Sequence, residues 1–113
     1  MHELSLAQSI VEIATSHARA EGSGRVTKVF LKIGALAHVD PGALTFAFDA
    51  VSAGTLAEGA EVIIERGAAK AFCVPCGLTI EVATHADVCP HCGVHQWMLT
   101  EGDEMRVTEL EVE

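Results

Sequence analysis

The sequence Cys73-Val-Pro-Cys76 is followed, twelve residues later, by Cys89-Pro-His-Cys92, and these two pairs contain all four cysteines of the chain. Two Cys-x-x-Cys pairs at this spacing are typical of zinc ribbons. In a ribbon each pair forms a tight turn, called a knuckle, and the two knuckles supply four thiolates to one tetrahedral ion. The stretch therefore predicts a metal-bound module that holds the fold together.

A glycine follows the second cysteine of each pair, at Gly77 and Gly93. The absence of a Cβ suits a knuckle, because the backbone there turns back so that its N–H groups point at sulfur. Two structural disulfides would need an oxidising compartment, and the first residues do not resemble a signal peptide. A single thioredoxin-like redox pair would leave the second pair unexplained, and iron is the second choice of metal. Four thiolates leave no coordination position for a substrate, so the ribbon is expected to be structural.

The composition limits the classes of partner. The 113 residues suffice for one modest core, or for a small core plus a metal-stapled module. The formal net charge is -9 with only 7 Lys and Arg, and residues 72–102 contain neither. This argues against nucleic-acid binding and favours a basic protein or a cation as the partner. No apolar run is long enough to cross a bilayer, so we expect a soluble protein with no membrane insertion. Four cysteines confined to a metal motif fit a reducing, cytoplasmic location.

Residues 3–19 have the periodicity of an amphipathic helix that ends at Gly22-Ser23-Gly24. Its polar half includes Thr15, and His17 lies within the apolar half, where we expect a partly buried histidine and not a metal ligand. The apolar half is formed by Leu4, Leu6, Ala7, Ile10, Val11, Ile13, Ala14 and Ala18.

The remaining elements alternate in type. A strand is expected over residues 25–34, with Val29, Leu31 and Ile33 on its buried face. A second helix should start at the N-cap Asp40 with Pro41 at its first position, and end before Gly54; its apolar stripe is Leu44, Ala47, Phe48 and Val51. A second strand is expected over residues 60–66, and residues 67–70 should link it to the ribbon.

A last strand is expected over residues 105–112, after a turn at Gly102-Asp103. Its apolar residues change from odd positions, Met105 and Val107, to even positions, Leu110 and Val112. This change indicates a bulge near Thr108, or that different parts of the strand pack against different layers. The order predicts an α+β fold: two helices on a small three-stranded sheet, with the four-cysteine ribbon as an insertion. The expected domains are residues 1–69 plus 104–113, and residues 70–103.

The chain begins Met1-His2-Glu3, which offers a second type of metal site. The terminal amine, the His2 backbone nitrogen and the His2 imidazole can close fused chelate rings around one ion, and a carboxylate can complete a plane. Such nitrogen and oxygen ligation selects Ni(II) or Cu(II). Alternatively, His2 is simply solvated and Glu3 complements the positive end of the first helix. His38 and Asp40 could supply further ligands if the two helices pack side by side.

The chain resembles the HypA/HybF family of nickel metallochaperones along essentially its whole length. The resemblance rests on Met1 to Leu6, on Val29 to Gly34, on Asp40-Pro41 with Leu44, Phe46, Phe48 and Asp49, on Cys89 to Gly93, and on Gly102 to Met105. Each of these motifs is weak alone, and the set in this order is specific.

The resemblance implies a non-enzymatic protein that carries Ni(II) to the maturing large subunit of a [NiFe]-hydrogenase. It implies a HypB-like GTPase as partner, and urease as an additional acceptor in some members. The sequence does not determine the oligomeric state, and a homodimer is one of the possible states. By motif, His2 would be the main nickel ligand with Met1 and Glu3. The cysteines Cys73, Cys76, Cys89 and Cys92 would hold zinc. The alternatives are a zinc-ribbon adaptor between proteins, with no specific nickel site, and an enzyme that uses one cysteine pair.

Overall fold

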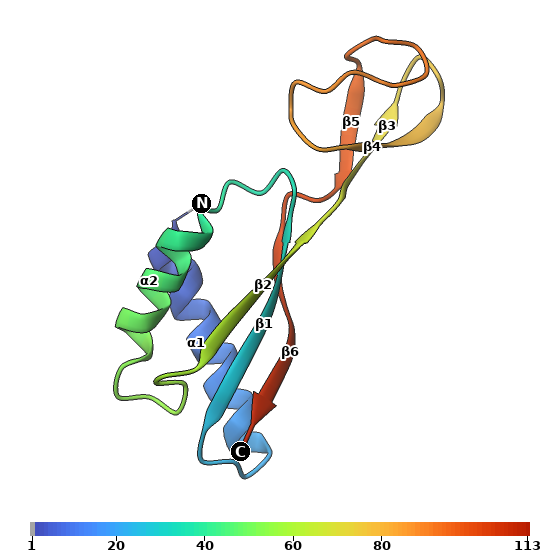
Figure 1. The fold of residues 1–113 in the computed structure, drawn as a ribbon. Coiled ribbons are helices and arrows are strands. Elements are labelled where there is room, and N and C mark those ends of the chain that lie inside the picture. The colour runs from blue at the N-terminus through green and yellow to red at the C-terminus, as the bar shows by residue number, and fades with distance from the viewer. Residues whose placement is uncertain (1) are drawn as a thin grey trace. The chain divides into compact units, whose positions relative to one another are not determined.

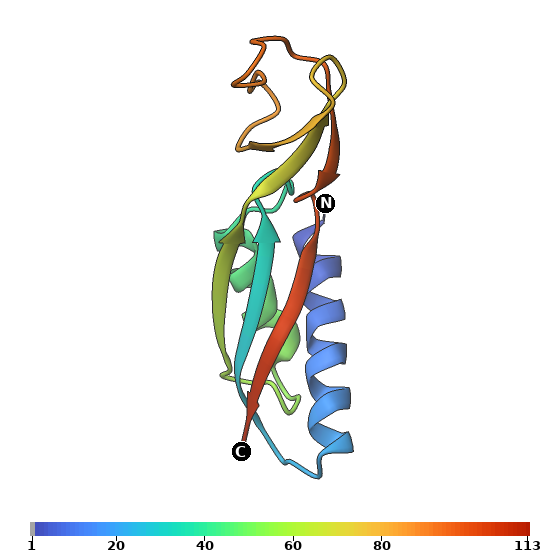
Figure 2. The ribbon, with the colours of Figure 1, turned by 90° about the vertical axis from the view of Figure 1, so that its right-hand side faces the viewer.

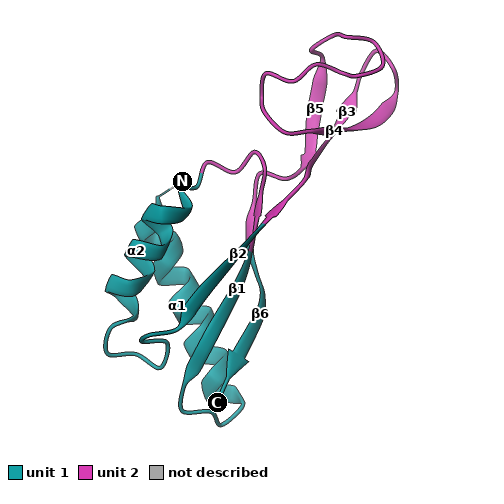
Figure 3. Cartoon of the chain, in the orientation of Figure 1, with its two compact units in different colours: residues 1–31, 39–65, 106–113 teal, residues 32–38, 66–105 magenta. Residues whose placement is uncertain are grey.

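The computed structural model describes residues 2–113, so Met1 lies outside the described residues. The chain forms two compact units, shown in Figure 3. Unit 1 comprises residues 1–31, 39–65 and 106–113, and unit 2 comprises residues 32–38 and 66–105. The predicted α+β class is confirmed, and the cysteine module has a three-stranded sheet of its own.

Unit 1 places two helices on a three-stranded sheet. The helices are α1 (Glu3–Ala20) and α2 (Pro41–Ser52), and they lie side by side against one face of the sheet (Figures 1 and 2). The sheet has the order β2-β1-β6, formed by β1 (Val26–Gly34), β2 (Glu61–Gly67) and β6 (Met105–Val112). The central strand β1 buries Val29, Leu31 and Ile33, as its alternation predicts.

Helix α1 buries a narrower stripe than its sequence suggests. Ile10, Val11 and Ala14 are buried, but Leu4 and Ile13 are 55% and 51% exposed, so their predicted places in the buried face are wrong. Thr15 is buried although its wheel position is polar. Its hydroxyl donates to the Val11 carbonyl at 2.8 Å, and this bond within the helix satisfies the polar atom away from water.

Helix α2 has the predicted start and stop. Asp40 is its N-cap, and the carboxylate accepts hydrogen bonds from the N–H groups of Gly42 and Ala43 at 2.9 and 3.3 Å. Pro41 occupies the first position, where its missing N–H removes no helical bond. The helix ends at Ser52, and Gly54 follows with φ +78°, a left-handed conformation that glycine adopts without strain.

Unit 2 contains a second antiparallel sheet, with the order β4-β3-β5. Its strands are β3 (Ala69–Cys73), β4 (Leu78–Val82) and β5 (Trp97–Glu101). Since β3 begins at Ala69, the predicted linker over residues 67–70 is wrong: a single residue separates β2 from β3. One residue of β5, Thr100, is extra in the register, and its hydroxyl donates to the Lys70 carbonyl at 3.0 Å.

The last strand has the burial pattern that its apolar phase indicates. Met105 and Val107 are half-buried on odd positions, and Leu110 and Val112 are half-buried on even positions. The intervening Thr108 is exposed, and its hydroxyl donates to the Phe30 carbonyl of the neighbouring strand at 3.3 Å. The change of face along β6 is therefore confirmed.

Two glycines permit a close approach of backbones in unit 2. A Cβ added to Gly34 would lie 2.1 Å from the Gly102 carbonyl oxygen, and one added to Gly102 would lie 2.4 Å from the Ala69 Cα. The Gly34 N–H donates to the Glu104 carbonyl at 2.9 Å, and the Leu36 N–H donates to the Gly102 carbonyl at 2.9 Å. Three chain segments are thus bonded at a distance that only glycine allows.

We expect Gly34→Ala to destabilise the protein by about 1–3 kcal/mol, because the new methyl group would meet backbone that cannot move aside. The matched control is Gly24→Ala, since nothing lies within 4 Å of a Cβ at that position and its φ is not left-handed. Urea unfolding of both variants measures the difference. Equal stability of the two variants would contradict the role of the close approach.

Candidate metal centre

The structure brings the four cysteines together. Their Sγ atoms all lie within 4.8 Å of one another, and they form the single cluster of three or more potential metal ligands found among residues 2–113. The Sγ atoms of Cys73 and Cys92 are 3.7 Å apart, and those of Cys76 and Cys89 are 3.9 Å apart. Tetrahedral zinc with Zn–S bonds of about 2.3 Å separates its sulfurs by about 3.8 Å. The donor set therefore fits a tetrahedral thiophilic cation.

The two knuckles have the same backbone geometry. The N–H of Gly77 donates to the Cys73 carbonyl, and the N–H of Gly93 donates to the Cys89 carbonyl, both at 2.8 Å. The two glycines have φ values of +66° and +71°. This left-handed conformation at the residue after each pair is the one that the sequence predicts.

The N–H groups inside the knuckles act on the thiols. Burial would raise the pKa of Cys89, but hydrogen bonds from the Cys92 and His91 N–H groups lower this pKa to about 6. Contact with the Cys92 sulfur, together with burial, raises the pKa of Cys76 to about 12. The Cys76 N–H would lower the pKa of Cys73, yet burial and the neighbouring sulfurs raise it overall. One thiol of the cluster thus ionises readily while two others resist ionisation.

The cysteines are part of the core of unit 2. Its buried residues are Leu36, Ala69, Ala71, Cys73, Ile80, Val82 and Cys89, with Cys76 and Trp97 among the half-buried residues packed against them. A core that is this small, and that includes two of the thiols, stabilises a sheet weakly without an additional crosslink. The metal site is therefore also the centre of packing.

The first knuckle follows the paired strand β3, whereas the second knuckle lies in the segment between β4 and β5, which contains no helix or strand. The spacing of the cysteines does not indicate what orders this segment. Asp87 accepts hydrogen bonds from the Ala83 and Thr84 N–H groups and from the Thr84 hydroxyl, and these bonds lower the pKa of its carboxyl group. The Thr84-x-x-Asp87 pattern is the sequence signal that could have predicted this turn.

Two of the predicted nickel ligands, His2 and Glu3, lie at the start of unit 1. His2 is the N-cap residue of α1, with an exposed side chain and extended backbone at φ -87° and ψ 115°. Its side chain forms no capping bond, and its carbonyl accepts from the Leu6 N–H at 3.1 Å. Glu3 is half-buried in the first turn, and Met1 lies outside the described residues.

The other histidines are placed differently from expectation. His17 is exposed, with its Nε2 3.4 Å from a Glu21 carboxylate oxygen, so the expected partial burial is wrong. The exposed His38 and His85 rings are stacked in unit 2, with centroids 5.3 Å apart. Asp40 uses its carboxylate to cap α2.

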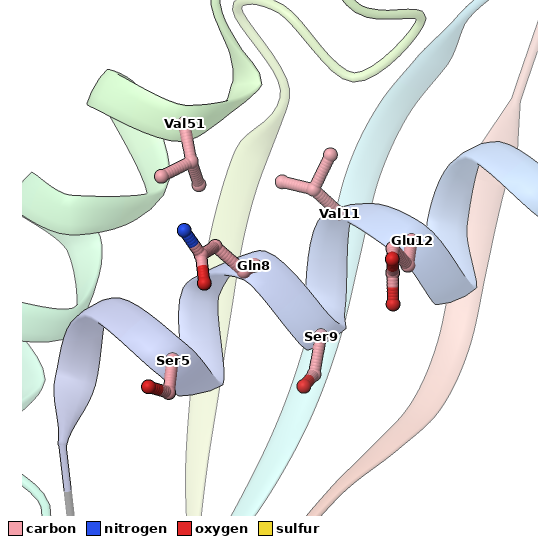
Figure 4. Close-up of a pocket in the computed structure, with 6 residues that line it drawn as sticks. All are labelled: Ser5, Gln8, Ser9, Val11, Glu12 and Val51. Carbon is pink, nitrogen blue, oxygen red and sulfur yellow. The ribbon is translucent and has the colours of Figure 1, made fainter.

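A groove of about 450 Å³ runs along α1 beside α2 (Figure 4). It is lined by Ser5, Gln8, Ser9, Val11 and Glu12 of α1 and by Val51 of α2. A hydroxyl-rich surface with one carboxylate does not resemble a metal site, because hydroxyl groups are weak ligands for Ni(II) or Zn(II). Neither helix in residues 2–113 is long and apolar enough to span a membrane.

Comparison with known proteins agrees with this pairing of an α/β unit and a four-cysteine unit. The family model described as "Hydrogenase/urease nickel incorporation, metallochaperone, hypA" matches residues 1–112. The chain belongs to the HypA family. It is therefore a nickel metallochaperone of hydrogenase and urease maturation, a non-catalytic class of protein, with a four-cysteine site.

Relatives in the HypA family match over the full length. The hydrogenase maturation factor HypA of Acidithiobacillus ferrooxidans is 47% identical over 113 residues, covering 100% of both chains. The HypA of Bradyrhizobium sp. is also 47% identical, with 100% of both chains covered. The solution structure of the nickel metallochaperone HypA from Helicobacter pylori has the same fold, with a TM-score of 0.71 at 24% identity over 99% of this chain and 97% of that chain.

We expect zinc loading of the four cysteines to release about one proton fewer at pH 7.5 than at pH 5. At pH 7.5 Cys89, with its pKa of about 6, has already lost its proton, whereas Cys76, with its pKa of about 12, must give one up. Below about pH 6 Cys89 also holds its proton, so zinc affinity should fall more steeply as the pH decreases. Calorimetric titrations in buffers of different ionisation enthalpy count the protons, and equal release at the two pH values would contradict the lowered pKa.

Proposed function

We propose that this chain carries Ni(II) at its N-terminus and transfers it to the immature large subunit of a [NiFe]-hydrogenase. The ligands are the His2 imidazole and backbone nitrogen, the Met1 amine and Glu3, through its backbone or carboxylate. Nitrogen and oxygen donors in one plane favour Ni(II) over Zn(II) and Mg(II). His38 and Asp40 are not needed for this set, since Asp40 is already committed to the cap of α2.

The observation that supports this proposal best is that α1 begins at Glu3, directly after His2. The N–H groups of the first helical turn have no partner within the helix, and the His2 N–H precedes them. A metal can therefore displace the proton of the His2 amide without breaking a helical hydrogen bond. The exposed imidazole leaves the ion open to exchange, which transfer to an acceptor requires.

The proposal gives Cys73, Cys76, Cys89 and Cys92 a resident Zn(II). When bound, this ion supplies a tetrahedral crosslink between the two knuckles. Knuckle N–H groups directed at Cys73 and Cys89 stabilise the thiolate charge. The closed set of four thiolates keeps this ion resident while the N-terminal ion exchanges.

The proposed working parts are a nickel-binding domain of residues 1–69 plus 104–113 and a zinc-binding domain of residues 70–103. The proposed partners are a HypB-like GTPase and the hydrogenase large subunit, with urease as a further acceptor. A net charge of -9 suits basic protein surfaces and disfavours nucleic acid. Reduced thiols at the zinc site are consistent with a cytoplasmic location.

An adaptor function without a specific nickel site is the second candidate. It is favoured by exposed apolar side chains in the cysteine unit, where Val74, Leu78 and Met98 are 56%, 48% and 61% exposed. Exposed side chains of this kind occur at protein–protein contacts. The two candidates differ in whether the N-terminus binds nickel tightly.

We expect zinc-loaded, untagged protein to bind one Ni(II) ion tightly, and His2→Ala to lose this site, because the imidazole closes one chelate ring. Calorimetric titration measures both proteins. The matched control is His17→Ala, which removes an exposed histidine of the same helix and should leave the titration unchanged. Acetylation of the terminal amine should weaken binding about as much as His2→Ala. A wild-type protein without a tight site would favour the adaptor.

We expect Cys73→Ser to loosen the zinc unit and leave the N-terminal nickel site able to bind. Removing one of four thiolates breaks the crosslink, whereas the proposed nickel ligands belong to unit 1. Zinc content after dialysis against a chelator, followed by nickel titration, measures the two effects separately. Joint loss of both metals would show that the sites depend on each other.

A further inference from the structure

The side chain of Trp97 connects the two knuckles of unit 2. Trp97 lies directly opposite Cys73 in the pairing of β5 with β3, and it packs against the core that contains Cys73 and Cys89. Its indole N–H donates to the Asp87 carbonyl at 2.8 Å. Asp87 is two residues before Cys89, so one half-buried side chain contacts the strand of the first knuckle and the approach to the second.

The acceptor of this bond is itself held in a turn. One oxygen of the Asp87 carboxylate accepts from the Ala83 and Thr84 N–H groups at 2.7 and 3.2 Å, and the other accepts from the Thr84 hydroxyl at 2.7 Å. The Ala86 N–H in turn donates to the Thr84 hydroxyl at 3.3 Å. These bonds set the direction in which the chain leaves β4 and reaches Cys89.

A second contact ties the exit of this segment to its entry. The Nε2 atom of His95 lies 2.7 Å from the His85 carbonyl oxygen. The His95 and Trp97 rings form a T-shaped contact, with centroids 5.2 Å apart and an interplanar angle of 80°. The residues before the second cysteine pair, His85 and Asp87, are therefore bonded to the residues after it, His95 and Trp97.

The two cysteine pairs differ in what orders them. The first pair begins at the end of β3, which is bonded to strands on both sides. The second pair lies between β4 and β5 in a segment without regular backbone pairing. The backbone bonds at Cys89 are local, from its N–H to the Val94 carbonyl and from the Gly93 N–H to its own carbonyl. The side-chain hydrogen bonds nearest to Cys89 along the chain are those of Asp87 and Trp97, and they tie the second pair to β4 and β5.

We propose that Trp97 and Asp87 are positioning residues for the metal centre: together they hold the second knuckle at ligand distance from the first and so slow the release of zinc. This inference rests on the proposed zinc site. A ligand set that is already ordered loses less conformational entropy on binding, and partners beyond the direct ligands commonly change metal affinity.

The test measures the rate at which a chelating dye removes zinc from the full-length, zinc-loaded protein. Trp97→Phe keeps an aromatic ring against the core and removes the N–H donor. Asp87→Asn keeps the side-chain shape and replaces one acceptor oxygen by a donor. Each loses hydrogen bonding worth about 0.5–1.5 kcal/mol, so zinc release should accelerate about two- to thirteenfold in each variant.

Two controls use the same strand. Met98→Leu changes the exposed neighbour of Trp97, and Glu101→Gln removes an exposed contact with Lys70. Both should release zinc at the wild-type rate. Helical circular dichroism and a zinc content of one ion per chain establish that the variants are folded and loaded before the chelator is added.

The double variant decides whether the two residues act on one segment. Because both hold the same turn, the acceleration in the double variant should be smaller than the product of the single effects. Wild-type release rates in both single variants would overturn the inference and leave the zinc site standing. A wild-type protein that binds no zinc would instead overturn the proposed zinc site, and this inference with it. Independent effects that multiply would contradict a shared turn.

Discussion

Four sulfur atoms within 4.8 Å of one another are the constraint on which unit 2 depends. Thiolates at this distance repel one another, and thiols there bury polar groups with few partners, so the arrangement is stable around a cation. The rest of the unit offers little compensation. Two of its seven buried core residues are cysteines and two more are alanines, so only three larger aliphatic side chains are left to stabilise the unit by burial. The backbone is arranged around the sulfurs: the glycine after each pair has a left-handed conformation, and backbone N–H groups point toward sulfur.

The two proposed metal sites have opposite designs. The cysteine site takes its ligands from two knuckles, with Cys73 and Cys89 buried in the core of their own unit, whereas His2 is exposed at the residue before a helix. Burial and a complete ligand set favour retention, and exposure with chain-end donors favours exchange. A carrier needs both properties in one chain, because release of the transferred ion must not remove the ion that stabilises the fold.

The sequence predicted the elements of unit 1 to within a residue or so, because their signals are local: Asp40-Pro41 starts α2 and the alternation of Val29, Leu31 and Ile33 marks β1. It also predicted the cysteine cluster, because two Cys-x-x-Cys pairs at this spacing are typical of metal-binding ribbons. It did not predict β3, β4 and β5, which are short, with five residues each; β3 pairs with β4 in a local hairpin and with β5 across the intervening cysteine segment. The Trp97–Asp87 bond was likewise missed, because it depends on how the irregular segment between β4 and β5 folds back. The approach of Gly34 to Gly102 was missed because the two residues are far apart in sequence.

The strand order β2-β1-β6 has a consequence for biosynthesis. The central strand β1 needs β6 as its second neighbour, yet the ribosome makes β6 only after the whole cysteine unit. During translation, the unit that carries His2 therefore waits with an open sheet while the four cysteines emerge. In a nascent chain all four thiols are thus available to a metal ion before the sheet of unit 1 is complete.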